Sequence, residues 1–145
     1  MGMESRMHQS DKGVGRKIET AKAPTALGSY SQGRRSGRML YTSGQIGLDP
    51  KTLKLVDGIE AQIRQTFANI EAICEAAGAT LESITKLTVF LVQKDDWAHV
   101  NRIMAELFIG DFPARTAVGV VWLPVGAAVE IEAIAEIPAD ETPIG

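Results

Sequence analysis

The hydrophobic positions between residues 59 and 77 recur at steps of three and four residues. Residues so spaced share one face of an α-helix, so the pattern predicts an amphipathic helix over residues 59–77. Asp57 and Glu60 resemble a capping pair at its start, and Gly78 is a natural stop. The stripe consists of Ile59, Ile63, Phe67, Ile70, Ile73, Cys74 and Ala77.

A second apolar stripe predicts a helix over residues 96–108. Pro113 bars further helix because it lacks a backbone N–H and its ring clashes with the preceding turn. Cys74 lies within the first stripe, and we interpret it as a packed core thiol and not as a nucleophile. The second stripe consists of Trp97, Val100, Ile103, Met104, Leu107 and Phe108.

Runs rich in β-branched residues flank the two helices. KIET predicts a short strand, and RRSGR predicts a hairpin turn between YSQG and MLYTSG. Further strands are expected over 83–92, 114–122 and 129–137. Strands, helix, strand, helix and two strands follow one another, which indicates an α+β fold with a single mixed sheet and both helices packed on one face.

Side-chain alternation along the last two strands predicts what the other sheet face carries. We expect that face to be too mixed in polarity for a core and too apolar for plain solvent. It therefore suggests an oligomer whose sheets meet, with clefts between subunits. The residues expected there are Arg115, Ala117, Gly119, Val121, Glu130 and Glu132.

The composition is that of one globular domain. The chain has 145 residues, of which 45% are hydrophobic and 23% charged. A net charge of -3 with a pI near 5.4 gives no global basic footprint for nucleic acid. One cysteine excludes an internal disulfide and fits the cytoplasm, and no apolar run approaches the roughly 18 residues of a membrane span. We interpret residues 1–16 as a flexible extension without a signal core, 17–137 as the domain and 138–145 as a short tail.

Arg115 is the main candidate for binding an anion. It interrupts an apolar strand beside Ala117 and Gly119, whose small size leaves space for a ligand. The planar guanidinium can hold a carboxylate through two parallel hydrogen bonds. The alternative is a structural ion pair with Glu130 or Glu132 on the neighbouring strand.

The glutamates have two interpretations as well. Alternating Glu130 and Glu132 can simply form a solvated face, or one of them can move protons after burial has raised its pKa. No metal-ligand spacing, Ser-His-Asp arrangement, phosphate-binding loop or dinucleotide fingerprint is visible, so neither metal nor cofactor is expected. Weaker pocket candidates, whose residue types also occur in ordinary turns and solvated helices, are Tyr30, Ser43, Gly44 and Asn101.

Seven segments together resemble the Rid/YjgF family of reactive intermediate deaminases, also labelled the endoribonuclease L-PSP family. They occur in the family's order and cover about residues 17–137, and it is their combination that is specific. The segments are APTALGSYSQG, LYTSGQIGLDP, QTFANIEAICEAAG, ITKLTVFLV, VNRIMAELF, FPARTAVGV and LPVGAAVEIEAIAEI.

The resemblance implies a fold like the chorismate mutase of bacilli. It also implies a homotrimer with a central β-barrel and an active site in each cleft between subunits. The implied reaction is hydrolysis of short enamine and imine acids, such as 2-aminoacrylate and 2-aminocrotonate, to 2-keto acids and ammonia. Enzymes that use pyridoxal phosphate (PLP), the dehydratases, release these intermediates.

The resemblance also implies roles for single residues. Arg115 in PARTAV matches the arginine that holds the substrate carboxylate, and Glu130 in VEIEAIA matches the glutamate that orients water. Ala117 replaces a cysteine found in several members, which implies a changed pocket size and substrate range, and Ser29 replaces a common proline. Tyr30, Ser43, Gly44 and Asn101 match pocket positions.

Three alternatives remain open. A non-catalytic sensor of keto acids or amino acids would use the same Arg115. A relative specialised for a larger substrate would exploit the small Ala117 and Gly119. A ribonuclease or translation inhibitor has as its support only the basic turn with Arg34, Arg35 and Arg38.

Overall fold

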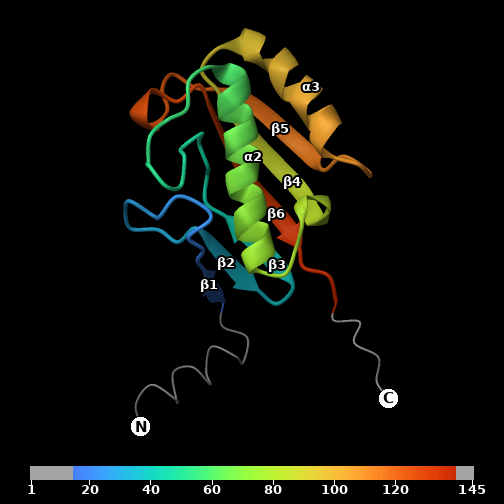
Figure 1. Cartoon of the computed structure of the whole chain (residues 1–145). Helices are drawn as coiled ribbons and strands as arrows, with labels where there is room; N and C mark the ends of the chain where they lie inside the picture. Colours follow the sequence, from blue (N-terminus) through green and yellow to red (C-terminus); the bar gives the residue numbers. More distant parts are fainter. Residues whose placement is uncertain (1–14, 140–145) are drawn as a thin grey trace, which may run out of the picture.

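The computed structural model describes residues 15–139, which form one sheet with two helices on one of its faces (Figure 1). This confirms the predicted α+β class. The interpretations of residues 1–14 and 140–145 lie outside the described residues. The helices are α2 (Ile59–Ala76) and α3 (Trp97–Leu107). The strands are β1 (Arg16–Ile18), β2 (Gly33–Ser36), β3 (Met39–Thr42), β4 (Ile84–Leu91), β5 (Ala114–Gly119) and β6 (Val129–Glu136).

The six-stranded sheet has the order β1-β2-β3-β6-β4-β5. β4 and β5 are parallel, and α3 lies between them in the sequence, whereas every other pair of neighbours is antiparallel. The last strand, β6, therefore inserts between β3 and β4 at the centre of the sheet. This insertion brings the C-terminal strand beside segments from both halves of the chain.

The predicted stripe of α2 packs on the sheet and forms one side of the core. Ile63, Ile70 and Ile73 are fully buried, and Phe67 meets Phe108 edge-on, with ring centroids 5.8 Å apart. Cys74 is buried too, and this burial, with smaller contributions from two glutamates, raises the pKa of its thiol to about 12. The interpretation of Cys74 as a core thiol is confirmed.

Several local predictions were wrong at the ends of elements. Gly58, and not a side chain of the Asp57–Glu60 pair, caps α2. Arg34 and Arg35 belong to strand β2, so the turn before β3 contains only Gly37, at φ +59°, and Arg38. β5 ends at Gly119, and Trp122, which the pattern assigned to this strand, is 70% exposed beyond it.

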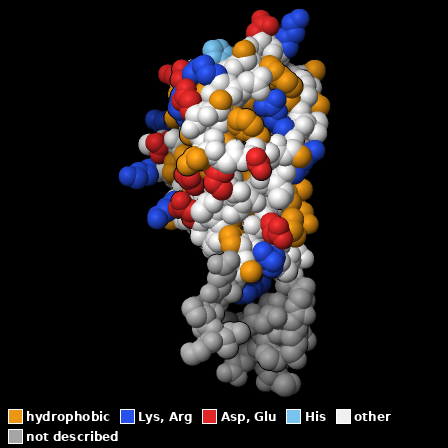
Figure 2. All heavy atoms as spheres, turned by 90° about the vertical axis from the view of Figure 1, so that its right-hand side faces the viewer, with side chains coloured by type: hydrophobic (Ala, Val, Ile, Leu, Met, Phe, Trp, Pro, Cys, Tyr) orange, Lys and Arg blue, Asp and Glu red, His pale blue; other side chains and the backbone are white. Residues whose placement is uncertain are grey.

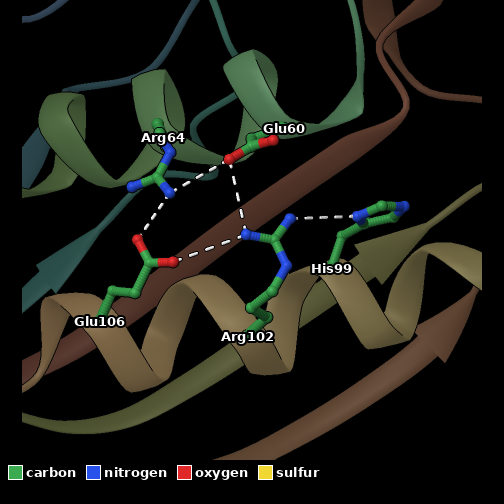
Figure 3. Close-up of polar contacts among 5 residues, drawn as sticks. All are labelled: Glu60, Arg64, His99, Arg102 and Glu106. Atoms are coloured by element: carbon green, nitrogen blue, oxygen red, sulfur yellow. Dashed lines mark hydrogen bonds and ion pairs between the residues drawn. The ribbon is translucent and has the colours of Figure 1, made fainter.

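A network of ion pairs joins α2 to α3 on the surface (Figure 3). Arg64 of α2 contacts Glu60 at 3.2 Å and Glu106 of α3 at 2.6 Å. Arg102 of α3 lies 3.5 Å from each of the same two glutamates, and its guanidinium is 3.4 Å from His99 Nδ1. The network favours one position of α3 over the sheet, although such exposed pairs contribute little energy individually.

Candidate functional site

Arg115 lies in a cleft between β5 and α3. The cleft has a volume of about 500 Å³, and we call it the Arg115 cleft. A nitrogen of the guanidinium donates to the sulfur of Met104 at 3.4 Å, and the guanidinium carbon lies 4.8 Å from the centre of the Trp97 ring. Asn101, Met104, Ala105, Phe112, Pro113 and Arg115 line the cleft.

The predicted sheet face of Arg115 was wrong. Parallel pairing places Arg115 beside Leu87 and Ala117 beside Val89, and both β4 residues belong to the core beneath the helices. Glu130 pairs with Phe90, which points to the opposite face because neighbours along a strand alternate. Within one chain, Arg115 and Glu130 therefore lie on opposite faces of the sheet.

No carboxylate within residues 15–139 forms an ion pair with Arg115. The structural pair with Glu130 or Glu132 does not form inside the chain, since both glutamates occupy the other face. A thioether is a weak acceptor, so the contact with Met104 leaves most of the donor capacity of the guanidinium available. The cleft therefore contains a cation that has no anionic partner among residues 15–139.

Glu130 lies in a second cavity of about 330 Å³, which we call the Glu130 pocket. Its side chain is half-buried. Burial and, secondarily, the charge of Glu132 raise the pKa of the Glu130 carboxyl above its ordinary value. A carboxylate with a raised pKa is a better proton acceptor at neutral pH than an exposed one. The pocket is lined by Pro24, Thr25, Leu27, Tyr30, Gly44, Gln45, Ile46, Leu48, Pro124, Val125 and Glu130.

Gly44 lets the backbone approach the Glu130 carboxylate closely. A Cβ atom at this position would lie 2.7 Å from the carboxyl carbon and 3.0 Å from Cγ of Glu130. A Cβ at this position would therefore force the Glu130 side chain to move, so the observed position of the carboxylate depends on a glycine here. The isolated bridge between Gln45 and Ile131 holds this segment against β6, next to Glu130.

The remaining predicted residues divide between the two cavities. Tyr30 lines the Glu130 pocket, half exposed, and its hydroxyl accepts a hydrogen bond from the Leu27 N–H at 3.3 Å. Asn101 lines the Arg115 cleft. Ser43 and Ala117 line neither: the Ser43 hydroxyl donates to the carbonyl of Ser31 at 2.6 Å, and Ala117 packs against the core.

Two buried amides support the Glu130 pocket, and neither was predicted from the sequence. Gln32 accepts from the N–H of Thr20 and donates to the carbonyls of Thr20, Ala23 and Pro24, which fixes the loop before Tyr30. Asn69 of α2 donates to the carbonyls of Ile46 and Leu48 at 3.1 and 3.0 Å. In the sequence, Asn69 lies on the flank of the predicted apolar stripe. That position was the signal from which its burial could have been predicted.

Trp97 belongs to the predicted apolar stripe of α3, but it is not part of the buried core. Its side chain is 45% exposed and lies over Arg115. Two basic residues of the predicted turn donate hydrogen bonds to backbone carbonyls of distant residues. Arg34 donates to the carbonyl of Gly15, and Arg38 donates to that of Ile137.

The sheet face without helices carries exposed hydrophobic side chains. Tyr41 and Val118 are 46% and 42% exposed, and Val121, in the segment beyond β5, is 91% exposed. Figure 2 views the molecule from the right-hand side of Figure 1, and hydrophobic side chains follow the right edge of this view while charged ones predominate on the left. An apolar surface of this kind is typical of an interface.

No group of three or more histidine, cysteine or acidic side chains within residues 15–139 comes close enough to hold a metal ion. Over the same residues, no helix has the length and hydropathy needed to cross a membrane.

Comparison with known proteins gives consistent matches over the whole body. The family model described as Endoribonuclease L-PSP matches residues 20–137. A RutC family protein of Pyrococcus horikoshii is 47% identical over 119 residues, which are 81% of this chain and 94% of that protein. The human protein named 2-iminobutanoate/2-iminopropanoate deaminase is 43% identical over 123 residues, 84% of this chain and 90% of its own length.

Solved structures agree with the sequence matches. RidA from an Antarctic Psychrobacter superposes with a TM-score of 0.83 at 46% identity, covering 84% of this chain and 99% of that one. The crystal structure of E. coli TdcF with bound serine gives a TM-score of 0.81 at 39% identity, covering 83% and 98%.

Proposed function

The chain belongs to the Rid/YjgF family, and from this premise we propose that it hydrolyses short 2-imino acids, and the enamines in equilibrium with them, to 2-keto acids and ammonia. Relatives at 42% to 45% identity are named 2-iminobutanoate/2-iminopropanoate deaminases, which supports this reaction class. The substrates are of the 2-aminoacrylate and 2-aminocrotonate type.

Arg115 holds the substrate carboxylate in this proposal. Its support is the cleft itself, where the guanidinium lacks a carboxylate partner among the described residues and faces about 500 Å³ of space. A relative that carries bound serine, an amino acid with a carboxylate, is consistent with such a ligand. Asn101 adds an amide at the same cleft.

Glu130 positions and deprotonates water. The water oxygen forms a bond to the C=N carbon, the π electrons move to nitrogen, and Glu130 accepts the proton. Glu130 returns that proton to the nitrogen, which gives a neutral carbinolamine. Glu130 then transfers the hydroxyl proton of the carbinolamine to the amino nitrogen, the C–N bond breaks, and ammonia leaves as C=O forms. An imine is already electrophilic, so the proposed steps need no metal or cofactor, and general acid–base help worth roughly 10²–10⁴-fold is sufficient.

We further propose that each site forms between two subunits of a homotrimer. Arg115 and Glu130 lie on opposite sheet faces of one chain, so a small substrate can contact both only if a second copy supplies one of them. The exposed hydrophobic face offers the surface for such an assembly. Tyr30, Gly44 and Glu130 would then belong to one subunit and Asn101 and Arg115 to its neighbour, with Ser43 and Ala117 beside the site.

The observation that carries the proposal is Arg115, which has no carboxylate partner among residues 15–139, in a chain whose relatives include named imine deaminases. A coupled assay tests it: a PLP-dependent serine or threonine dehydratase generates the enamine, and keto acid formation is followed with and without this protein. We expect acceleration by the wild type, and strong loss of it in Arg115→Ala and in Glu130→Gln.

Wild-type acceleration that survives Arg115→Ala with an intact fold would refute the carboxylate clamp. Absence of any acceleration, together with keto acid binding, would favour the sensor. The proposal places the protein in the cytoplasm, close to the dehydratases that release its substrates.

A further inference from the structure

The guanidinium of Arg115 is held from one side by an aromatic ring. Trp97, the first residue of α3, lies with its ring centre 4.8 Å from the guanidinium carbon. We infer that Trp97 is a positioning residue for carboxylate binding, which fixes the plane of the Arg115 guanidinium. The inference takes the reaction from the proposed function. Binding of a carboxylate by Arg115 can be tested separately, without turnover.

An aromatic ring and a carboxylate bind different parts of a guanidinium group. A ring that packs on a guanidinium attracts the cation through its negative face and leaves the N–H groups at the edge free. Those edge groups are the ones that bind a carboxylate through two parallel bonds. The contact with Trp97 is therefore compatible with a bound carboxylate, whereas a structural ion pair would use the same N–H groups as the carboxylate.

A second contact from the same helix further restricts the orientation of the Arg115 side chain. Met104, two helical turns after Trp97, accepts a hydrogen bond from one guanidinium nitrogen at 3.4 Å. No acidic side chain in the described part of the chain assists these two contacts. An arginine loses considerable rotamer entropy when it is immobilised, so a guanidinium oriented before the ligand arrives binds it more tightly.

The position of Trp97 indicates that it acts through Arg115. It is not among the residues that line the Arg115 cleft, and it is 45% exposed, so the core does not require its full volume. Truncation of this side chain should consequently change carboxylate affinity more than folding. A residue that fixed carboxylate binding in ground and transition states alike would change KM while leaving kcat nearly constant.

The test compares Trp97→Leu and Trp97→Phe with the wild type. Calorimetric titration with pyruvate measures carboxylate binding without turnover, and the coupled dehydratase assay gives kcat and KM. We expect Trp97→Leu to weaken pyruvate binding and to raise KM by about 2- to 30-fold, the range of a cation–π contact, with kcat close to wild type. Trp97→Phe, which keeps an aromatic face, should restore most of the affinity.

Thermal unfolding is measured for each variant, and Trp97→Gln replaces the leucine variant if the latter unfolds. Unchanged pyruvate affinity and KM in the leucine or glutamine variant would overturn the inference, and so would wild-type protein that binds no pyruvate. A fall in kcat with constant KM would overturn it as well. If the wild type binds pyruvate but does not accelerate hydrolysis, the proposed function fails, while the affinities of the variants still decide the role of Trp97.

Discussion

Substitution of Gly44 by alanine should strongly lower the activity and leave the stability almost unchanged. The new Cβ would lie 2.7 Å from the carboxyl carbon of Glu130, whereas carbon atoms in contact prefer about 3.5–4.0 Å. The carboxyl group must therefore move by about 1 Å, and a displacement of this size in a reacting group can cost ~100-fold in rate. The obstructing atoms belong to the end of a side chain, and the φ angle of Gly44 is not left-handed, so stability should stay within about 1 kcal/mol of wild type.

The coupled dehydratase assay measures the rate, and urea unfolding measures the free energy. Gly47→Ala is the matched comparison, because its Cβ would lie 2.8 Å from the backbone Cα of Gln62 in α2, which cannot swing away. We expect Gly47→Ala to destabilise the fold by about 1–3 kcal/mol. A Gly44→Ala variant with the wild-type rate and an undisturbed fold would show that the position of the Glu130 carboxylate is not critical, and the reasoning would fail.

Three further predictions concern Glu130 and its surroundings. The rate should fall as the pH drops through the pKa of Glu130, because protonation removes the base, and the raised pKa places this loss at higher pH than for an exposed glutamate. Glu132→Gln removes the second cause of the shift, so the acid limb of the pH–rate profile should move to lower pH; an unmoved limb would contradict the assignment. Asn69→Ala leaves the carbonyls of Ile46 and Leu48 without their amide donor and should cost about 1–3 kcal/mol in urea unfolding; a cost near zero would mean that water replaces the amide.

Most of the fold followed from periodic patterns. The 3.6-residue spacing gave both helices to within a residue or two, and the strand runs gave the mixed sheet. The end of β5 was predicted wrongly because some apolar residues there do not take part in strand pairing within the chain. Val121 and Trp122 extend the apolar run of β5 in the sequence, but in the structure they are exposed beyond its end.

The candidate residues were identified from the sequence with help from the family resemblance, but their arrangement was not. Nothing in a linear pattern indicated that Gln32 would be buried, because its partners are backbone groups of an irregular segment. The position of Asn69 on the flank of the apolar stripe was a signal, but it did not identify the distant carbonyls that the amide binds. Trp97 matched the helical stripe, but it contacts Arg115, which lies 18 positions later on β5. The stripe carries no information about where β5 lies.

The sequence by itself determined which residues share a face of a strand or a helix, since that follows from local backbone geometry. It did not determine toward which side of the sheet each face points. Only the register between strands decided that Arg115 lies with Leu87 beneath α3, while Glu130 lies with Phe90 on the opposite side. Period-two alternation is the same for either orientation of a strand, so the choice depends on pairings between segments far apart in the chain.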